Sequence, residues 1–402
     1  MTTKKLIQSE IKRQQSTINL IPSENYPSKA IREAVGSLLM SKYAEGYPAK
    51  RYYAGNKVID QIENLAIVAA KKAFGADHAN VQPYSGTPAN LAIYSALANP
   101  GDRIMSMSLS HGGHLSHGHK ANFSSQVYKF VNYGVDEKTH QLDYAEIRKL
   151  ARVFKPKVIV CGATAYPRKI DFKKFAEIAK EVNAYCVADI SHIAGLVAAG
   201  HHQNPTKYCD VVMTTTHKTL RGPRGAIILC KKDLASKIDK AVFPGFQGGP
   251  HLHSIAGKAI CLQEAKSVNF KKYIKQVLTN TKLLAEELKS KGFKIITNGS
   301  DNHLILVDVS NFKLTGKVAT EALEQAGIIA NKNLIPFDHK SPFEPSGIRL
   351  GAAAITTRGM KEREIKKIAQ WIYEVMVNYT SKSDLSKINK EVKQLCKKFP
   401  IK

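Results

Sequence analysis

The sequence lacks any apolar run approaching the roughly 20 residues that a membrane-spanning helix needs. Its first fifteen residues, MTTKKLIQSEIKRQQ, are basic but have no apolar centre of the kind found in secretory signals. The six cysteines form no CxxC pair, and several lie in apolar, strand-like segments such as AYCVAD and AIILC. This pattern favours reduced, buried thiols over a disulfide framework. We therefore expect a cytoplasmic protein.

Acidic residues are scarce, with 33 Asp and Glu against 60 Lys and Arg, which gives a net charge of +27. The excess is mostly lysine and is densest in the tail SKSDLSKINKEVKQLCKKFPIK. Lysine on solvated helix faces explains it most simply, and an anionic substrate is a second contributor. Specific nucleic-acid binding is the weakest explanation, because no RNA- or DNA-binding motif is present.

The chain has no internal repeats and no low-complexity tract, and its 402 residues suggest two or three domains. ANVQPYSG, DRIMSMS, PKVIVCG, AYCVAD, DVVMTTT and GAIILC read as short strands separated by helix-length segments. Such alternation predicts an α/β fold with a mainly parallel sheet sandwiched by helices. The last third reads as a smaller α+β domain, with a strand at FKIITNG and a long final helix that contains the only tryptophan, Trp371. We expect an N-terminal arm over 1–40, a large domain over 41–268 and a small domain over 269–402.

Polar residues follow four of the predicted strands at the point where each strand ends. They are Thr164, the group Asp189, Ser191 and His192, the pair His217 and Lys218, and the turn Tyr84-Ser85-Gly86-Thr87 that opens a helix. In open α/β sheets, ligands bind at the carboxyl ends of the strands. We therefore expect these residues to serve one ligand.

This combination suggests pyridoxal phosphate, which needs a lysine for a Schiff base, an acid facing its pyridine nitrogen and a phosphate cradle. Lys218 would supply the amine and Asp189 the acid. The turn before Thr87 would cradle the phosphate, because free backbone N–H groups and the positive end of the helix dipole converge there. Taken singly, Lys218 is explained as a surface lysine and Asp189 as a helix cap. Taken together, they favour the cofactor.

The segment TTTHKTLRGPRG, residues 214–225, resembles the lysine motif of the serine hydroxymethyltransferase family of fold-type I pyridoxal-phosphate enzymes. Further segments resemble that family in order along nearly the whole chain: INLIPSEN, SKYAEGYPAKRYYAG, NVQPYSG, SHGGHLSHG, VADISHIAGLVAAG, AVFPGFQGGP, IAGKA, DNHLILVD, LTGK, NKN, SPF and SGIRLG. The resemblance implies a transferase of one-carbon metabolism and glycine biosynthesis. It would convert serine and tetrahydrofolate into glycine and methylene-tetrahydrofolate as a homodimer with shared active sites.

The resemblance also implies a role for each matching residue. Catalysis would involve Lys218, which binds the cofactor as a Schiff base, together with Glu45 as acid and base, His217 and Tyr53. The cofactor would further contact Ser85, Gly86, Thr87, His114, Thr164, Asp189, His192 and Gly249. The amino-acid substrate would contact Ser23, Tyr43 and Arg349, whose planar guanidinium suits a carboxylate. Folate would lie against Tyr52, Leu109, Gly113, His114, Leu115, Asn333, Ser341, Pro342 and Phe343.

The histidine-rich loop SHGGHLSHGHK departs from the family after its folate-site residues, and the resemblance assigns no role to His117 or His119. His111, His114, His117 and His119 have an alternative interpretation as a metal site. The loop lacks nearby cysteines or acids and regular i, i+4 spacing, so we expect no metal there. Two other functions stay open: an aldolase of threonine-like substrates that needs no folate, and an RNA-binding protein that uses the lysine-rich tail.

Overall fold

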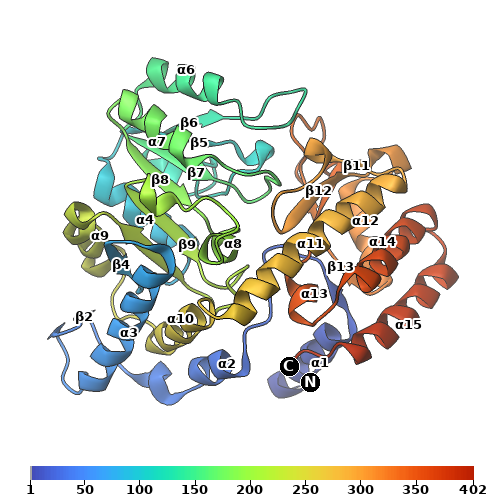
Figure 1. Ribbon diagram of the computed structural model, residues 1–402, viewed down its shortest axis with the longest axis horizontal. Coiled ribbons are helices and arrows are strands. Elements are labelled where there is room, and N and C mark those ends of the chain that lie inside the picture. The colour runs from blue at the N-terminus through green and yellow to red at the C-terminus, as the bar shows by residue number, and fades with distance from the viewer. Residues whose placement is uncertain (1) are drawn as a thin grey trace. The chain divides into compact units, whose positions relative to one another are not determined.

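The computed structural model describes residues 2–402, which form two compact units (Figure 1). The larger unit comprises residues 27–164 and 169–274, and the smaller comprises 2–26, 165–168 and 275–402. Helix α11 (Val268–Ser290) begins in the larger unit and ends in the smaller. None of the helices within residues 2–402 is long and apolar enough to cross a membrane.

A seven-stranded sheet in the order β4-β10-β9-β8-β7-β5-β6 forms the centre of the larger unit. The strands are β4 (His78–Asn80), β5 (Arg103–Met107), β6 (Lys129–Tyr133), β7 (Val158–Gly162), β8 (Tyr185–Asp189), β9 (Val211–Thr215) and β10 (Ala226–Cys230). The pairings from β6 through β9 are parallel, and β10 runs antiparallel to both β9 and β4. The prediction of a mainly parallel sheet with flanking helices is confirmed.

Helices of the larger unit flank this sheet, and a short strand pair precedes it. The helices are α2 (Lys29–Val35), α3 (Lys57–Phe74), α4 (Gly86–Leu97), α5 (Ser124–Val127), α6 (Tyr144–Phe154), α7 (Phe172–Glu181), α8 (Ala194–Ala198), α9 (Ala235–Lys240) and α10 (Leu252–Glu264), and the pair is β2 (Gly46–Tyr47) with β3 (Lys50–Arg51). Strands β7, β9 and β10 are buried at every position, which explains their continuous apolar sequences.

The sequence analysis missed strand β6, which is the edge strand beside β5. Its first and fourth residues, Lys129 and Asn132, are exposed, and only Tyr133 is fully buried. A half-exposed edge strand carries charged and polar residues, so it lacks the continuous apolar pattern by which the central strands were recognised.

The smaller unit contains a four-stranded antiparallel sheet in the order β11-β12-β15-β14. Its elements are α1 (Thr3–Ser16), β1 (Ile18–Asn19), β11 (Lys294–Ile295), β12 (Leu304–Asp308), α12 (Gly316–Gln325), β13 (Ile328–Ile329), β14 (Asn331–Asn333), β15 (Gly347–Gly351), α13 (Ala353–Thr357), α14 (Glu362–Val377) and α15 (Lys382–Lys398). The strand predicted over FKIITNG is short, because the backbone turns over residues Ile296–Asn298 and leaves the extended conformation there. Thr297 lies there in the left-handed region at φ 62°.

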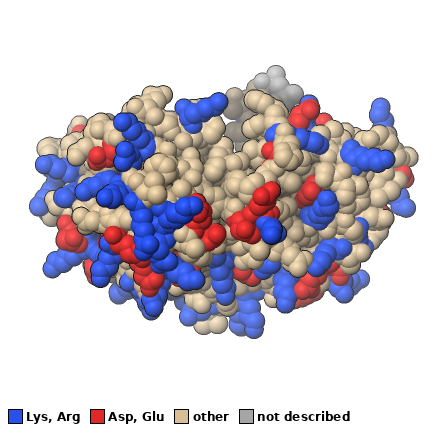
Figure 2. All heavy atoms as spheres, turned by 90° about the horizontal axis from the view of Figure 1, so that it is seen from above, with Lys and Arg blue, Asp and Glu red and all other residues tan. Residues whose placement is uncertain are grey.

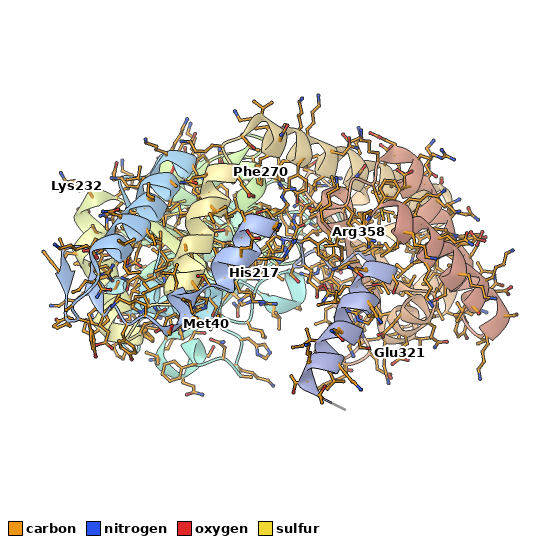
Figure 3. The ribbon with its side chains drawn as sticks, turned by 90° about the horizontal axis from the view of Figure 1, so that it is seen from below. Met40, His217, Lys232, Phe270, Glu321 and Arg358 are labelled. Atoms are coloured by element: carbon orange, nitrogen blue, oxygen red, sulfur yellow. The ribbon has the colours of Figure 1, made fainter. Side chains whose placement is uncertain are left out.

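The N-terminal segment is an integral part of this smaller unit. β1 pairs in parallel with β13, so that Ile18 is the partner of Ile328, and both are fully buried. Arg358 donates hydrogen bonds to the carbonyl oxygens of Gln15, Thr17, Cys396 and Phe399, which joins the ends of α1 and α15 (Figure 3). These bonds satisfy helix-terminal carbonyls that have no partner within their own helix.

The lysine-rich tail forms a helix of its own, α15, and the single long final helix predicted for this region is wrong. Ser381 caps the start of α15, and Trp371 lies on the preceding helix α14. Leu385, Ile388 and Val392 bury one face of α15 in the core of the smaller unit. The lysines lie on its other positions, and Figure 2 shows Lys and Arg spread over the surface with fewer Asp and Glu among them.

Candidate functional site

A small cavity in the larger unit lies at the carboxyl ends of the central strands. Its lining consists of Gly86, Asn90, His114, His117, Ala163, Thr164, Asp189, Ser191, His192, Met213, Thr215 and Lys218. Six of these are residues that the sequence analysis assigned to the cofactor, namely Gly86, His114, Thr164, Asp189, His192 and Lys218. The structure therefore brings together residues that are up to about 130 positions apart, because parallel strands end at a shared edge.

Asp189 ends strand β8 and is buried among hydrogen-bond donors. Its Oδ1 accepts from the Ser191 backbone N–H at 3.0 Å and hydroxyl at 2.6 Å, and its Oδ2 lies 3.0 Å from Nε2 of His117. Asn90 Nδ2 donates to the same Oδ2 at 3.1 Å. Burial raises the pKa of the Asp189 carboxyl, but the bonds from His117 and Ser191 outweigh this and hold the pKa below its ordinary value. Asp189 is therefore a fixed buried anion.

His117 is a site residue to which the sequence analysis gave no role. Its ring is buried between Asp189 and the backbone N–H of His114, which donates to His117 Nδ1 at 3.2 Å. His114 in turn lies 2.8 Å from the hydroxyl of Ser116, and Ser116 accepts from Asn90 at 2.9 Å. These bonds link the histidine-rich loop to Asp189, so the loop and the acid form one rigid network.

The ring nitrogens of the four loop histidines do not converge on a common point. His111 Nδ1 accepts from the Val135 N–H at 3.0 Å, and His119 Nδ1 accepts from the Ala121 N–H at 3.3 Å, while His114 and His117 face the cavity. Within residues 2–402, the one group whose ligand atoms converge on a possible metal position consists of three cysteines elsewhere in the sheet.

Lys218 follows strand β9 in a turn that the backbone holds in place. Its carbonyl oxygen accepts from the Arg221 N–H at 3.0 Å, and the Gly222 N–H donates to Thr216 at 2.7 Å. A side chain at Gly222 would collide with the Thr216 oxygen at 2.8 Å and with Cys261 at 2.6 Å, so only glycine fits. Lys218 itself is 8% exposed and borders the same cavity as Asp189.

His217 lies beside Lys218 in the larger unit (Figure 3), and its partial burial together with the charges of Lys218 and Arg224 lowers its pKa to about 3. An unfolded histidine titrates near about 6.5, so between these values the unfolded chain binds a proton that the folded chain does not. We expect the cofactor-free protein to lose stability relative to His217→Asn as pH falls from about 6.5 to about 3, by up to about 1.4 kcal/mol per pH unit. Urea unfolding at several pH values measures the free energy of unfolding of both proteins. The same dependence of this free energy on pH in both proteins would contradict the expectation.

The start of helix α4 borders the same cavity through Gly86. Ser85 is its N-cap residue, but the Ser85 side chain makes no capping hydrogen bond, and Thr87 lies in the first turn. A Cβ at Gly86 would lie 3.0 Å from the Thr215 methyl group, so the helix start packs closely on β9. Because the first N–H groups of a helix have no intrahelical acceptor, they suit an anion such as phosphate.

Gly249 lies beside this turn through its contacts with Tyr84. The Tyr84 hydroxyl donates to the Gly249 carbonyl oxygen at 2.6 Å, and the Tyr84 N–H donates to Gln247 at 2.9 Å. The Tyr84 ring also stacks on His251 at 4.1 Å between ring centroids. The FQGGP segment is thereby fixed against the helix start. The residues that line the cavity do not include Ser85, Thr87 or Gly249.

The residues of the cavity fit pyridoxal phosphate. Asp189 supplies a buried anion, Lys218 an amine, and α4 an uncapped helix start. Two buried polar atoms of lining residues, Asn90 Oδ1 and Thr215 Oγ1, have no hydrogen-bond partner within residues 2–402. Buried polar atoms are rarely left without partners, so these two point to a polar ligand in the cavity.

Glu45 lies in a second cluster with Tyr43 and Tyr53. The rings of Tyr43 and Tyr53 are 5.1 Å apart, and a Cβ at Gly249 would lie 3.0 Å from the Tyr43 ring. A Cβ at Gly248 would lie 3.2 Å from Glu45 Oε1. Within residues 2–402, none of these residues lines the cavity that holds Lys218, and Tyr43, Tyr53 and the nearby Tyr52 are exposed.

Arg51 fixes the loop that carries Glu45. Its guanidinium donates to the carbonyl oxygens of Ala44 at 2.9 Å and Gly46 at 2.7 Å, on either side of Glu45. The same group binds Asp60 at 2.9 Å and the buried Glu63 at 2.6 Å. Five N–H donors in a planar fork make such simultaneous bonds possible.

From the acid–base role that the sequence analysis expects of Glu45, we predict that Arg51→Lys lowers kcat about 10- to 100-fold while cofactor binding persists. Lysine cannot hold both carbonyls and both acids, so Glu45 would move out of place. Steady-state kinetics and cofactor titration of the variant measure the two effects. The matched control is Lys50→Met at the exposed neighbouring position. Unchanged kcat in Arg51→Lys would refute the positioning role.

The smaller unit holds Arg349 on strand β15. Its side chain is buried, its Nε donates to Asn331 Oδ1 at 3.2 Å, and burial lowers its pKa to about 10. The segment that carries Ser23 lies against the same strand, because a Cβ at Gly351 would lie 2.7 Å from the Cα of Pro22. Arg349 is thus a buried cation next to an N-terminal segment of its own unit.

The predicted folate residues fall into two sets. In the larger unit, Leu109, Gly113 and Leu115 lie on the loop after β5, where Gly113 packs so closely on Met107 that no side chain fits. In the smaller unit, Asn333 ends β14, and Ser341, Pro342 and Phe343 are exposed in the loop before β15. Lys332 donates to the Phe343 carbonyl oxygen at 2.6 Å, which holds this loop to β14.

The family model described as serine hydroxymethyltransferase matches residues 2–372 of the 402 residues. The match includes both clusters of the larger unit as well as Arg349 and the folate-loop residues of the smaller unit. Residues 373–402, which comprise the last residues of helix α14 and the whole of helix α15, follow the matched region.

Proposed function

The chain belongs to the serine hydroxymethyltransferase family and is thus a pyridoxal-phosphate-dependent enzyme of serine and glycine, and we propose that it converts L-serine and tetrahydrofolate reversibly into glycine and 5,10-methylenetetrahydrofolate. Enzymes of this family use tetrahydrofolate as co-substrate. The observation that carries the proposal is the cavity in which Lys218 and the buried anion Asp189 meet beside an uncapped helix start.

In the proposed site, Lys218 is the amine to which the cofactor attaches, and Asp189 pairs with the pyridine nitrogen. The bound cofactor supplies an electron sink for the substrate's α-carbon. His117, Ser191 and Asn90 keep Asp189 ionised and oriented through their hydrogen bonds. Ser85, Gly86 and Thr87 bind the phosphate, His114 lies over the ring, and Thr164 and His192 lie near the phenolic oxygen.

Arg349 is proposed to bind the substrate carboxylate, with Ser23 in support. The planar guanidinium of an arginine can hold a carboxylate through two parallel hydrogen bonds. Glu45 is proposed to move the proton at the serine hydroxyl and at the folate, with Tyr43 and Tyr53 arranging it and His217 beside the reacting amine. Folate is proposed to contact the residues that the family resemblance assigns to it, namely Tyr52, Leu109, Gly113, His114, Leu115, Asn333, Ser341, Pro342 and Phe343.

We further propose that two copies of the chain share their active sites. Large apolar side chains near Glu45 are exposed, among them Leu38 at 90% and Met40 at 59%. Tyr43, Tyr52, Tyr53, Val58 and Leu65, in the same stretch of sequence, are exposed as well. Large exposed apolar side chains concentrated in one stretch favour an interaction surface, and a partner would place Tyr53 and Gly249 at its neighbour's cofactor. We also propose a cytoplasmic location, because all six cysteines are reduced and disulfides are rare in that compartment.

A visible absorption titration tests the function. We expect the protein reconstituted with pyridoxal phosphate to be yellow and to form an intense band at longer wavelength only when glycine and tetrahydrofolate are both added. A response to glycine that ignores tetrahydrofolate would favour the aldolase instead. Failure to acquire a cofactor band would refute the enzyme assignment. Deleting α15 and measuring RNA binding tests the remaining alternative, although the burial of Leu385 and Val392 gives that helix a structural role.

A further inference from the structure

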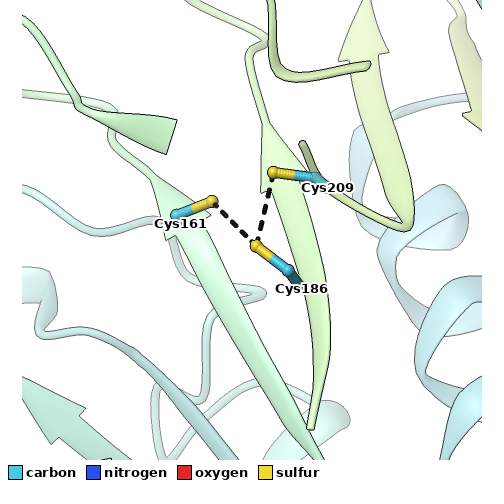
Figure 4. A group of neighbouring side chains, drawn as sticks. All are labelled: Cys161, Cys186 and Cys209. Carbon is cyan, nitrogen blue, oxygen red and sulfur yellow. Dashed lines mark hydrogen bonds between the residues drawn. The ribbon is translucent and has the colours of Figure 1, made fainter. Parts of the chain in front are cut away.

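Three cysteine side chains meet inside the central sheet of the larger unit (Figure 4). Cys186 Sγ lies 3.3 Å from Cys209 Sγ and 4.0 Å from Cys161 Sγ, and all three sulfurs lie within 4.8 Å of one another. The side chains are reduced and almost completely buried. The mechanism proposed above uses none of them.

The sheet register explains why the three side chains meet. Cys161 lies on β7 and Cys186 on β8, and the register that pairs Cys186 with Ile159 places Cys161 and Cys186 on the same face of the sheet. Cys209 lies two residues before β9, the next strand, and reaches Cys186 from the other side. Two neighbouring strands and the segment that leads into a third thus each direct one sulfur to a common point.

The sulfur separations suit a bound metal ion. Three atoms with these spacings can all lie at about 2.3 Å from one central point, which is the length of a zinc–thiolate bond. Thiolates are soft ligands and select zinc and copper(I) over magnesium or calcium. The same cluster offers no oxygen or nitrogen ligand of its own among the described side chains.

We propose that Cys161, Cys186 and Cys209 bind one thiophilic metal ion, Zn²⁺, through three thiolate sulfurs. As the three metal–sulfur bonds form, the three S–H protons leave to solvent, and no atom is oxidised or reduced. With a divalent ion the cluster of three thiolates has a net charge of −1, whereas with a monovalent ion its net charge would be −2. Because burying charge is costly, the divalent ion is favoured.

A solvent pocket lies next to one residue of the cluster, Cys186. The pocket has a volume of about 650 Å³ and reaches Cys186, and Lys207, Asp210 and Lys231 also line it. Asp210 accepts from the Cys186 backbone N–H at 2.9 Å and from Lys231 at 2.5 Å, so the Asp210–Lys231 ion pair stands beside the cluster. Zinc prefers four ligands, and a water would supply the fourth.

The proposed ion has a structural role. Cys186 is at the amino half of β8 and Asp189 is at its carboxyl end, about 10 Å further along at 3.3 Å per residue. The ion would join β7, β8 and the approach to β9 without entering the cofactor cavity. Because a metal that binds only the folded chain stabilises it, zinc should raise the unfolding temperature. The proposal is independent of the proposed enzymatic function.

Zinc binding by the reduced, cofactor-loaded protein tests the proposal. After chelator treatment and dialysis against Zn²⁺, elemental analysis should give one zinc per chain, and competition with a chromophoric chelator should give its affinity. Since losing even an outer-shell partner costs about 10- to 100-fold in affinity, Cys186→Ser should weaken binding by at least about 100-fold. Cys261→Ser, at an equally buried cysteine outside the cluster, is the matched control and should bind like the unaltered chain.

X-ray absorption at the zinc edge provides a test that needs no variant and so does not depend on whether Cys186→Ser folds. The proposal expects three sulfur scatterers at about 2.3 Å. Nitrogen and oxygen scatterers alone, less than one zinc per chain, or equal affinity in Cys186→Ser and Cys261→Ser would each overturn it. Formation of a Cys186–Cys209 disulfide in a protein that retains no zinc would identify the cluster as a redox pair instead.

Discussion

Asp189→Asn is expected to lower kcat/KM for serine by about three orders of magnitude, the scale of removing one electrostatic group from a reacting centre. Asparagine keeps the shape of Asp189 and its oxygen can still accept from Ser191, so the fold should persist. Its uncharged amide cannot balance the positive charge of a protonated pyridine nitrogen. The new NH₂ group would also face the NH₂ group of Asn90, so that two hydrogen-bond donors would meet. Steady-state kinetics at saturating cofactor measures the effect.

The control for this variant is Asp171→Asn, at the N-cap of helix α7, where asparagine caps as well as aspartate. It should keep the activity of the unaltered protein. If Asp189→Asn were to stay within about twofold of the unaltered protein, the role assigned to the buried anion would be wrong, since an uncharged partner would serve equally well.

Lys258→Met is expected to lower the free energy of unfolding by about 3–5 kcal/mol, which is the cost of removing one partner from a buried interaction of a charged group. Lys258 is fully buried on α10, and its Nζ donates to the carbonyl oxygens of Val81 at 2.7 Å, Pro83 at 3.0 Å and Ala226 at 3.0 Å. Burial lowers its pKa to about 7, while the three acceptors match the three N–H donors of the charged amine. Methionine fills the space but removes the lysine donor from all three carbonyls, of which Pro83 still accepts from the Ala226 N–H at 3.1 Å.

The shift in the midpoint of urea unfolding measures this loss, and Lys266→Met, at an exposed lysine just after the same helix, is the control. Val81 and Pro83 lead directly into the turn at Ser85, so the variant should also bind the cofactor more weakly. Equal midpoints for the two variants would show that the buried lysine is dispensable.

The sheet was predictable because its central strands are buried on both faces and read as continuous apolar segments. The edge strand β6 was not, since exposure of Lys129 and Asn132 removes that signal. The two helices at the C-terminus were merged because both are amphipathic, and the break at Ser381 lies in a run of polar residues that also suits a helix. The boundaries set for the arm and the two domains stay predictions.

Site residues at strand ends were predictable, because a strand end with a polar residue stands out in an apolar sequence. Lys218, Asp189 and Thr164 are of this kind, and all three border one cavity. Asn90 was missed, although an asparagine inside the apolar helix segment ANLAIYSAL is a usable signal. His117 was left without a role because its partner, Asp189, is 72 residues away in the sequence.

The cysteine cluster had no local signal at all. Cys161, Cys186 and Cys209 are separated by 25 and 23 residues, and no metal-binding motif has such spacing. Only the register between β7, β8 and β9 brings them together. The sequence analysis accordingly expected buried thiols and no metal site.

Glycine formation from serine, measured with and without tetrahydrofolate, tests the central claim most directly. The account predicts rapid turnover that requires both pyridoxal phosphate and tetrahydrofolate and that yields glycine and methylenetetrahydrofolate in equal amounts. Turnover of serine at the same rate without tetrahydrofolate, or none in the fully loaded protein, would contradict it.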